Sequence, residues 1–332
     1  MLLNHEQIVP LVHNALKTET DDRGRLRFLR FEPEQTAGYA LDGEQFPVRC
    51  RASANVTLEF ISDAEWFGFE YDVQAGSSRS FYGFDLFVDG ILEDSALIEG
   101  FASSAILFDL PGGTHRVTLF FPWSAEVMLK SMSVSDNAFI RPVPAKTPRI
   151  LTIGDSITQG YIAKHPGFCW VGKMTRELDA EVLNLGVGGY GFLTNSLQKP
   201  IGWKADLIIL SYGSNDFNRE ADRNSFAGCV SAYMRKLAEM FPQTPILQIP
   251  PIVRYDLKYL CREKSRGYTL GDAGRIIRDI AASYPQVEVM EDIGYPHVPD
   301  FFAPDSVHPN DLGFQLYGEA VIRAVKEKLR LT

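Results

Sequence analysis

The sequence predicts an α/β fold, a parallel sheet with helices on both faces, preceded by an all-β sandwich of the jelly-roll kind. Two observations predict this order. Six or more short runs rich in β-forming residues crowd into residues 26–134, and turn residues such as Asp89-Gly90 separate several of them. From residue 149 onward, short apolar runs alternate instead with helical patterns, which is typical of βαβ units.

The chain is expected to divide into four parts. Apolar residues at helical spacing predict an amphipathic amino-terminal helix within residues 1–22, and the sandwich is expected over residues 23–140. Three prolines fall in the nine residues 140–148, so residues 141–148 are expected to form a stiff linker. The parallel-sheet domain is then expected over residues 149–332.

The second half contains five expected strands and several helices. Right-handed crossovers bring the carboxyl ends of parallel strands to one edge of the sheet, where open α/β folds bind their ligands. The strands are expected at residues 150–153, 181–185, 206–210, 245–249 and 287–290, and the clearest helices at 170–178, 273–283 and 311–329.

Composition excludes several classes of protein. The chain is 45% hydrophobic, which suits a globular core, and its net charge of −9 argues against a nucleic-acid partner. No apolar run approaches the ~18 residues of a membrane span, and the first 22 residues lack the features of a secretion signal, so a cytoplasmic location is expected. The four cysteines match no metal-binding spacing, and nothing in the sequence predicts the oligomeric state.

Four short segments with reactive side chains follow strand ends or lie near them. Ser156 comes directly after the first strand, and a glycine-rich loop at residues 184–189 follows the second. Gly213-Ser-Asn-Asp216 follows the third strand, and Asp305-Ser-Val-His308 precedes the last helix. In an Asp-x-x-His turn the carboxylate can hold one ring nitrogen and leave the other facing a serine, as in a hydrolytic triad.

These segments resemble, in order, the sequence blocks of the SGNH hydrolases, the GDSL lipase/acylhydrolase superfamily, with Ile157 where leucine is usual. The resemblance covers residues 149–332 and implies a flavodoxin-like sheet. It implies Ser156 as nucleophile, His308 as base and Asp305 as the residue that orients the base. It also implies an oxyanion hole built from the backbone N–H groups of Ser156 and Gly189 and the side-chain amide of Asn215, with no metal or cofactor.

The first half adds a narrower resemblance. Gly83-Phe-Asp-Leu-Phe87 is similar to a Gly-x-Asp-Leu-Tyr segment that precedes the catalytic domain in some family members, and a sandwich before an SGNH domain is similar to two-domain carbohydrate acetylesterases. Some of those esterases lack the triad aspartate, whereas Asp305 is present here. The resemblance implies a serine esterase that forms an acyl-enzyme, with an O-acetylated oligosaccharide as the expected substrate.

Other interpretations of the function stay open at this point. One is a hydrolase of short acyl esters or thioesters, or a lipase-like acylhydrolase; another is a non-catalytic glycan-binding protein. Residues 186–191 also match the Gly-x-Gly-x-x-Gly dinucleotide fingerprint, but that fingerprint must open a helix, and Pro200 interrupts the following stretch. His165 and His297 each lie beside a proline without an Asp-x-x partner, and both are expected to be ordinary loop histidines.

Overall fold

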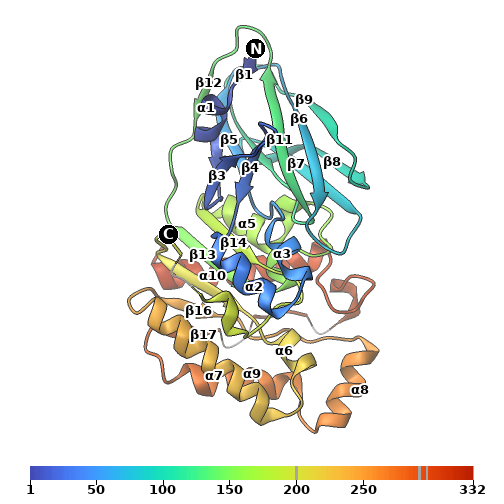
Figure 1. The fold of residues 1–332 in the computed structure, drawn as a ribbon, viewed down its shortest axis with the longest axis vertical. Helices are drawn as coiled ribbons and strands as arrows, with labels where there is room; N and C mark the ends of the chain where they lie inside the picture. The colour runs from blue at the N-terminus through green and yellow to red at the C-terminus, as the bar shows by residue number, and fades with distance from the viewer. Residues whose placement is uncertain (199–200, 291–292, 297, 332) are drawn as a thin grey trace.

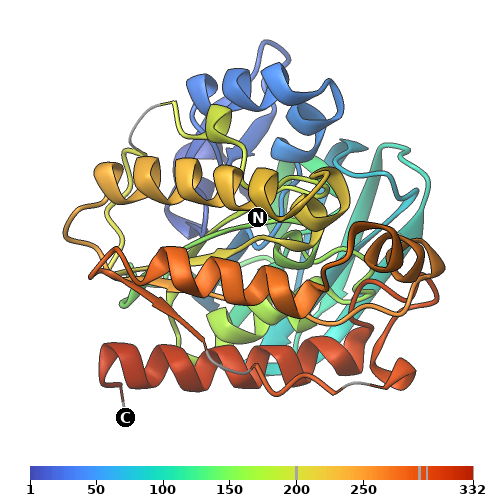
Figure 2. The same cartoon turned by 90° about the horizontal axis from the view of Figure 1, so that it is seen from below.

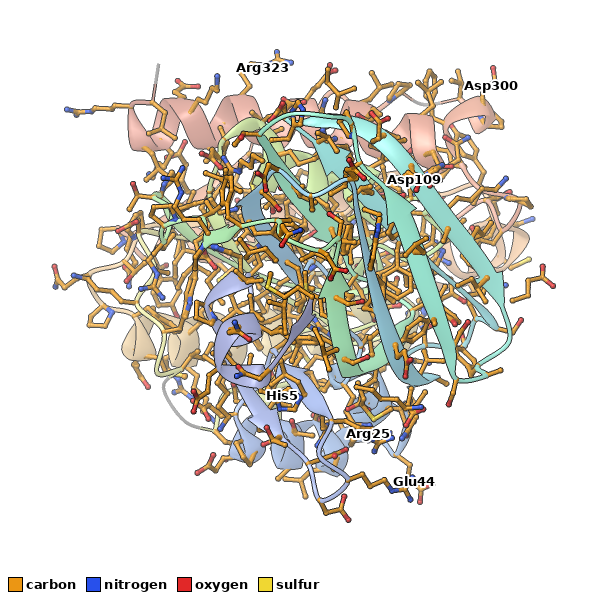
Figure 3. The ribbon with its side chains drawn as sticks, turned by 90° about the horizontal axis from the view of Figure 1, so that it is seen from above. His5, Arg25, Glu44, Asp109, Asp300 and Arg323 are labelled. Carbon is orange, nitrogen blue, oxygen red and sulfur yellow. The ribbon has the colours of Figure 1, made fainter. Side chains whose placement is uncertain are left out.

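The chain forms antiparallel β structure at one end and a parallel sheet covered by helices at the other (Figure 1). The computed structural model describes residues 1–198, 201–290, 293–296 and 298–331, apart from the side chains of residues 257–259 and 262. Figure 3, viewed from the sandwich end, shows the exposed charged residues Glu44 and Asp300 near the edge of the molecule.

Two antiparallel sheets share one core in the first half of the chain. Alternate side chains of a strand point to the same face, so each sheet contributes one apolar face, with residues such as Phe60, Phe69 and Phe84 between them. One sheet has the order β3 (Lys17–Thr20), β4 (Leu26–Leu29), β11 (Ala125–Val134), β6 (Trp66–Ala75), β9 (Ser104–Asp109), with β1 (Leu2–Leu3) beside β11. The other has the order β12 (Ile140–Pro142), β5 (Thr57–Ser62), β10 (His115–Phe120), β7 (Phe81–Val88), β8 (Ile91–Glu99), with β2 (Val12–His13) beside β5.

The prediction of an amino-terminal helix within residues 1–22 is correct for one turn only and wrong for the rest. Helix α1 spans only His5–Ile8, and a 3-10 turn, η1 (Val9–Leu11), follows it. Pro10 supplies no backbone N–H, so the α-helix cannot continue through it. The chain then extends into β2 and β3, and Ile8 and Leu11 pack into the sandwich core.

Helices α2 (Pro33–Asp42) and α3 (Gln45–Cys50), which the sequence did not predict, lie between β4 and β5. Tyr39 and Phe46 on these helices share a core with Leu185 and Tyr190 of the second half, so this part of residues 23–140 packs against the parallel sheet. At the other end of the expected sandwich, Arg141 and Pro142 pair with β5, so the first residues of the expected linker belong to a sheet.

The parallel sheet has the order expected of a flavodoxin-like fold. Numbered along the chain, its strands run 2-1-3-4-5, which confirms that fold class. Gly154 pairs with Gly186 on one side and with Ser211 on the other, so three strands end side by side. The strands, in spatial order, are β14 (Glu181–Gly186), β13 (Arg149–Gly154), β15 (Leu207–Ser211), β16 (Ile246–Gln248) and β17 (Val287–Val289).

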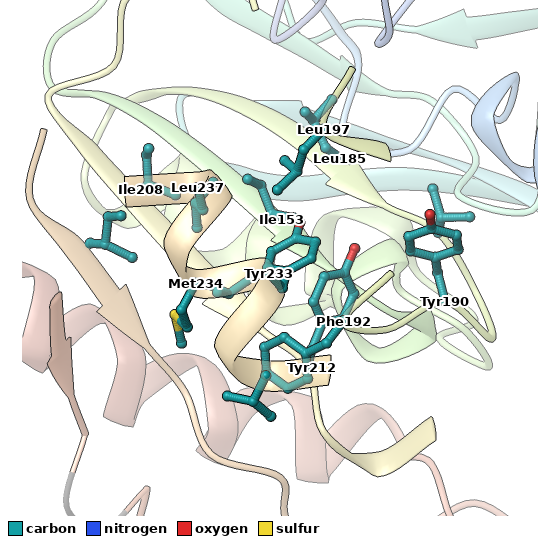
Figure 4. Packing of buried hydrophobic residues seen from close by; sticks show 14 of the residues in the cluster. Ile153, Leu185, Tyr190, Phe192, Leu197, Ile208, Tyr212, Tyr233, Met234 and Leu237 are labelled. Carbon is teal, nitrogen blue, oxygen red and sulfur yellow. The ribbon is translucent and has the colours of Figure 1, made fainter. Parts of the chain in front are cut away.

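Helices cover both faces of this sheet, as expected. Leu151 and Ile153 of β13 pack on the face covered by α7 (Arg223–Met240) and α9 (Leu270–Ala281), and Figure 4 shows Ile153 close to Tyr233 of α7. Ile150 packs on the opposite face, under α5 (Trp170–Glu177) and α10 (Asp311–Leu329). Figure 2 shows α7 and α9 side by side. Among the described helices, none combines the length and apolar character that crossing a bilayer requires.

The segment Gly83–Phe87 lies in β7, at the junction between the two halves. Asp85 is buried and accepts hydrogen bonds from the Gly167 N–H and from His165 Nδ1, each with a donor–acceptor distance of 2.8 Å. Burial raises the pKa of Asp85. His165 lies in a loop, as expected, and has a carboxylate partner, Asp85, that the local sequence does not show; His297 lies outside the described residues.

Candidate active site

Ser156 is held in a tight turn between β13 and a short helix, α4 (Ser156–Gln159). Asp155 caps this helix, and its carboxylate accepts the Ile157 N–H over 3.0 Å. The turn needs a glycine before it, because a Cβ atom at Gly154 would lie only 2.0 Å from Thr158 Oγ1. The strand therefore delivers Ser156 to the carboxyl edge of the sheet.

Ser156, His308 and Asp305 form a continuous hydrogen-bonded chain. Ser156 Oγ lies 2.7 Å from His308 Nε2, and His308 Nδ1 lies 2.7 Å from Asp305 Oδ2. The other Asp305 oxygen accepts the N–H groups of Val307 and His308, each over 3.0 Å. The carboxylate thus fixes both the ring and the turn that carries it, and the structure brings together the three side chains that the sequence placed in one site.

The Asp305 carboxyl is ionised in this arrangement. Burial alone would raise its pKa, but the hydrogen bond and the charge of His308 outweigh burial and lower the pKa to about 2. An ionised carboxylate accepts from Nδ1 and leaves Nε2 to face the Ser156 hydroxyl.

The three expected oxyanion donors surround one cavity with Ser156. Among the described residues, no protein group accepts the backbone N–H of Ser156 or of Gly189, whereas the Gly188 N–H donates to Gln159 Oε1 over 2.8 Å. Asn215, in α6 (Ser214–Arg219), donates through Nδ2 to Tyr190 O at 3.0 Å and to Asp155 Oδ2 at 3.4 Å. Ser156, Gly189 and Asn215 all line a cavity of about 300 Å³.

The glycine-rich loop after β14 does not open a helix. Residues 187–193 form turns and irregular backbone, and the next helical turn, η3, spans only Thr194–Ser196. The segment therefore lacks the helix that the dinucleotide fingerprint requires to bind a pyrophosphate. Among the described residues, no three His, Cys, Asp or Glu side chains cluster as a metal-ligand set.

A buried arginine that sequence reasoning missed braces this loop. The Arg30 side chain is 1% exposed and donates only to backbone carbonyls, and burial lowers its pKa to about 10. Its shortest hydrogen bonds go to Asn184 O and Ala52 O, at 2.5 Å each, and another goes to Arg49 O at 2.8 Å. Arg30 thus ties the end of β14 to α3, and a single arginine between apolar residues gave no signal of this role.

The amino-terminal half supplies part of the cavity wall. Arg49 from α3 and Ser77 and Ser78 from the loop between β6 and β7 line the cavity that contains Ser156. The Tyr161 ring lies against the His308 ring, tilted by 47° at a centroid distance of 4.6 Å, and its hydroxyl lies 2.9 Å from Ser78 Oγ. The site is therefore completed by residues from both halves, which the sequence did not predict.

Comparisons with known proteins agree with this fold. Residues 152–316 match the model of the GDSL-like Lipase/Acylhydrolase family. A curated relative, the "Acetylxylan esterase / glucomannan deacetylase" of Cellvibrio japonicus (strain Ueda107), is 25% identical over 218 residues, which are 53% of this chain and 60% of that protein.

Two solved structures cover nearly all of the chain. The salicylyl-acyltransferase SsfX3 from a tetracycline biosynthetic pathway superposes with a TM-score of 0.82 at 20% identity, over 100% of this chain and 99% of that one. A family two carbohydrate esterase from Clostridium thermocellum superposes with a TM-score of 0.67 at 15% identity, over 97% and 100% of the two chains. At these identities the likeness establishes the shared two-part fold.

The flavodoxin-like sheet and the three side chains at its edge define an α/β protein with a serine, a histidine and an aspartate hydrogen-bonded in series. Within that class, residues 152–316 match the GDSL-like lipase/acylhydrolase family. The resemblance on the four sequence blocks is thereby confirmed.

Proposed function

We propose that the chain is a serine esterase that removes acetyl groups from carbohydrates through an acyl-enzyme. One observation carries the proposal: Ser156 Oγ, the His308 ring and the Asp305 carboxylate form hydrogen bonds of 2.7 Å in series. That series is the arrangement in which a serine hydroxyl is activated for attack on a carbonyl.

The proposed reaction follows from these positions. His308 Nε2 takes the proton of Ser156 as Oγ attacks the ester carbonyl, and Asp305 stabilises the imidazolium that forms. The N–H groups of Ser156 and Gly189 and the Asn215 amide then face the developing oxyanion. His308 returns the proton to the leaving alcohol, and water, deprotonated by the same ring, releases the acid from Ser156.

The walls of the cavity favour a small acyl group and a polar alcohol. Ile157 and Val307 are the aliphatic residues among its described lining, and hydroxyl, amide, backbone and charged groups supply most of the rest. A long acyl chain needs a continuous apolar wall, whereas sugar hydroxyls need polar partners. The named activity of the acetylxylan esterase and glucomannan deacetylase relative supports the same choice.

Ser156→Ala tests the nucleophile. We expect turnover of 4-nitrophenyl acetate and of acetylated xylo-oligosaccharides to fall roughly 10⁴-fold or more, because the attacking oxygen is removed. The melting temperature should stay unchanged, because the rest of the site keeps its structure. Retained turnover in a pure sample of the folded variant would refute the assignment.

Two further measurements separate this function from its rivals. Butyrate and octanoate esters compared with acetate report the acyl length, and faster octanoate turnover would favour a lipase-like acylhydrolase. A fluorophosphonate probe should label the wild-type chain at Ser156, whereas a glycan-binding protein without catalysis should stay unlabelled.

A further inference from the structure

Arg49 is a partly buried cation that pairs with no acidic side chain in the part of the chain that the structure describes. Its Nη1 donates to the Gly188 carbonyl, and its guanidinium lies 5.8 Å from the centre of the Phe46 ring. None of the described carboxylates forms an ion pair with it. Burial lowers the pKa of Arg49, because the guanidinium has lost water without gaining a carboxylate in exchange. A guanidinium carries five N–H donors, so the described residues leave most of the hydrogen-bonding capacity of Arg49 unused.

This guanidinium lies beside the reacting centre. A Cβ atom added to Gly188 would be 3.6 Å from Ser156 Cβ and 3.7 Å from Arg49 Cδ, so the two side chains flank the same glycine. A Cβ atom at the next residue, Gly189, would come within 2.8 Å of Arg49 Nη1. The arginine therefore borders both the nucleophile and the loop that faces the oxyanion.

The other charged groups that line the cavity are already engaged. Arg254 donates through Nε to Asp256 over 2.8 Å, and Asp305 holds His308. Asp155 is buried and accepts the Ile157 N–H. In a chain with a net charge of −9, an arginine that lines a cavity and pairs with none of the described carboxylates is a specific feature of this site rather than part of a general excess of positive charge.

We propose that Arg49 binds a carboxylate carried by the ester substrate next to the bond that is cleaved. The planar guanidinium offers paired donors that match a carboxylate, which a neutral ester cannot exploit. The inference rests on the proposed esterase function and narrows its substrate class. The carboxylate belongs either to the alcohol half, as in an O-acetylated uronic acid, or to the acyl half, as in a hemisuccinate.

Matched pairs of substrates test the proposal and distinguish the two sources. The first pair is the methyl glycoside of an O-acetylated glucuronic acid and the same compound with its carboxylate blocked as a methyl ester; the release of acetate is measured. The second pair is 4-nitrophenyl hemisuccinate and the same compound with its free carboxylate blocked as a methyl ester; the release of 4-nitrophenol is measured. We expect the wild-type chain to prefer the acid of one pair by roughly 10- to 100-fold in kcat/KM, the range typical of a hydrogen bond to a charged group. The pair that shows the preference identifies the half that carries the carboxylate.

Variants at two nearby arginines show whether Arg49 causes the preference. Arg49→Gln should remove it by slowing the acid roughly 10- to 100-fold more than it slows the neutral ester. Arg49→Lys should retain part of the preference. Arg51→Gln removes the same charge two residues away, outside the cavity lining, and should leave the preference intact.

Three results would overturn the proposal. The wild-type chain could show no preference in either pair, or Arg49→Gln could slow acid and neutral ester equally, which would make Arg49 only a brace for the Gly188 carbonyl. If Arg49→Gln fails to fold, inhibition of the wild-type chain by methyl glucuronide and succinate is compared with their neutral methyl esters, and equal inhibition contradicts the proposal. Absence of wild-type turnover of 4-nitrophenyl acetate would instead count against the esterase function itself.

Discussion

At the scale of single residues, the division of work between Asp305 and His308 decides the chemistry. Asp305 uses one oxygen to hold the ring and the other to hold two backbone N–H groups. With a pKa of about 2, its carboxyl is ionised across the pH range in which proteins are usually assayed. An acid limb in a profile of rate against pH between 4 and 8 therefore does not come from titration of Asp305.

Asp305→Asn is predicted to lower kcat by roughly 10³- to 10⁴-fold, because an amide can donate to the ring and stabilise the wrong tautomer of His308. The measurement is kcat for 4-nitrophenyl acetate, normalised to correctly folded protein by near-ultraviolet circular dichroism. A loss smaller than tenfold would mean that the carboxylate does not orient the base.

At the scale of elements, a buried charge cluster pins the proline-rich segment to the sandwich. Lys146 Nζ lies 2.6 Å from Glu59 Oε1 on β5, and Arg116 Nη2 of β10 lies 2.8 Å from Glu59 Oε2. The Glu59 and Lys146 side chains are only 1% and 5% exposed. Burial alone would raise the pKa of Glu59, but the charge of Lys146 and the hydrogen bonds outweigh it and lower the pKa to about 2.

Glu59→Gln is predicted to reduce the free energy of unfolding by about 3–5 kcal/mol at pH 7, because it leaves Lys146 buried without a partner. Since the folded pKa of Glu59 lies below its ordinary value of 4.5, its contribution is complete above pH 4.5 and is lost as pH falls toward 2. Denaturant unfolding at pH 7 and pH 3 should therefore give a smaller difference at pH 3.

A surface pair provides the control for this measurement. Glu288 pairs with Lys328 and its side chain is 59% exposed, so Glu288→Gln should change the free energy of unfolding by less than about 1 kcal/mol at either pH. Equal losses for the buried and the exposed glutamate would show that the Glu59 cluster is not a stabilising contact.

At the scale of the whole molecule, the two halves form one site. Asp85 of the sandwich fastens the loop before α5, Ser78 holds Tyr161, whose ring lies against His308, and Arg30 joins α3 to the end of β14. The sandwich strands thus position catalytic-side loops as well as filling their own core.

Arg30→Met is predicted to lower the free energy of unfolding by about 3–5 kcal/mol, because methionine fills much of the space but leaves several buried carbonyls without donors. The change should also lower kcat, since α3 and the glycine-rich loop lose their link. Arg23→Met, at an exposed loop position, serves as the control in chemical denaturation and should change stability by less than about 0.5 kcal/mol.

The periodicity of the sequence was enough to predict elements in which burial repeats regularly. The strand at 150–153 and the helix at 311–329 are confirmed as β13 and α10, because each shows an apolar pattern of the right period. The segment around Ile8 fails the same test, since Pro10 ends its helix and its apolar residues face the sandwich instead.

By itself, the sequence determined the order of the strands in the second half of the chain and the local Asp305–His308 turn, because these depend on spacing within a few residues. Only the tertiary structure decided that Arg30, Arg49 and Tyr161 belong to the site, since their contacts form when residues more than a hundred positions apart pack together. The physical reason is that a residue pattern encodes which face of an element is buried, whereas the partner that covers that face depends on the packing of the whole chain.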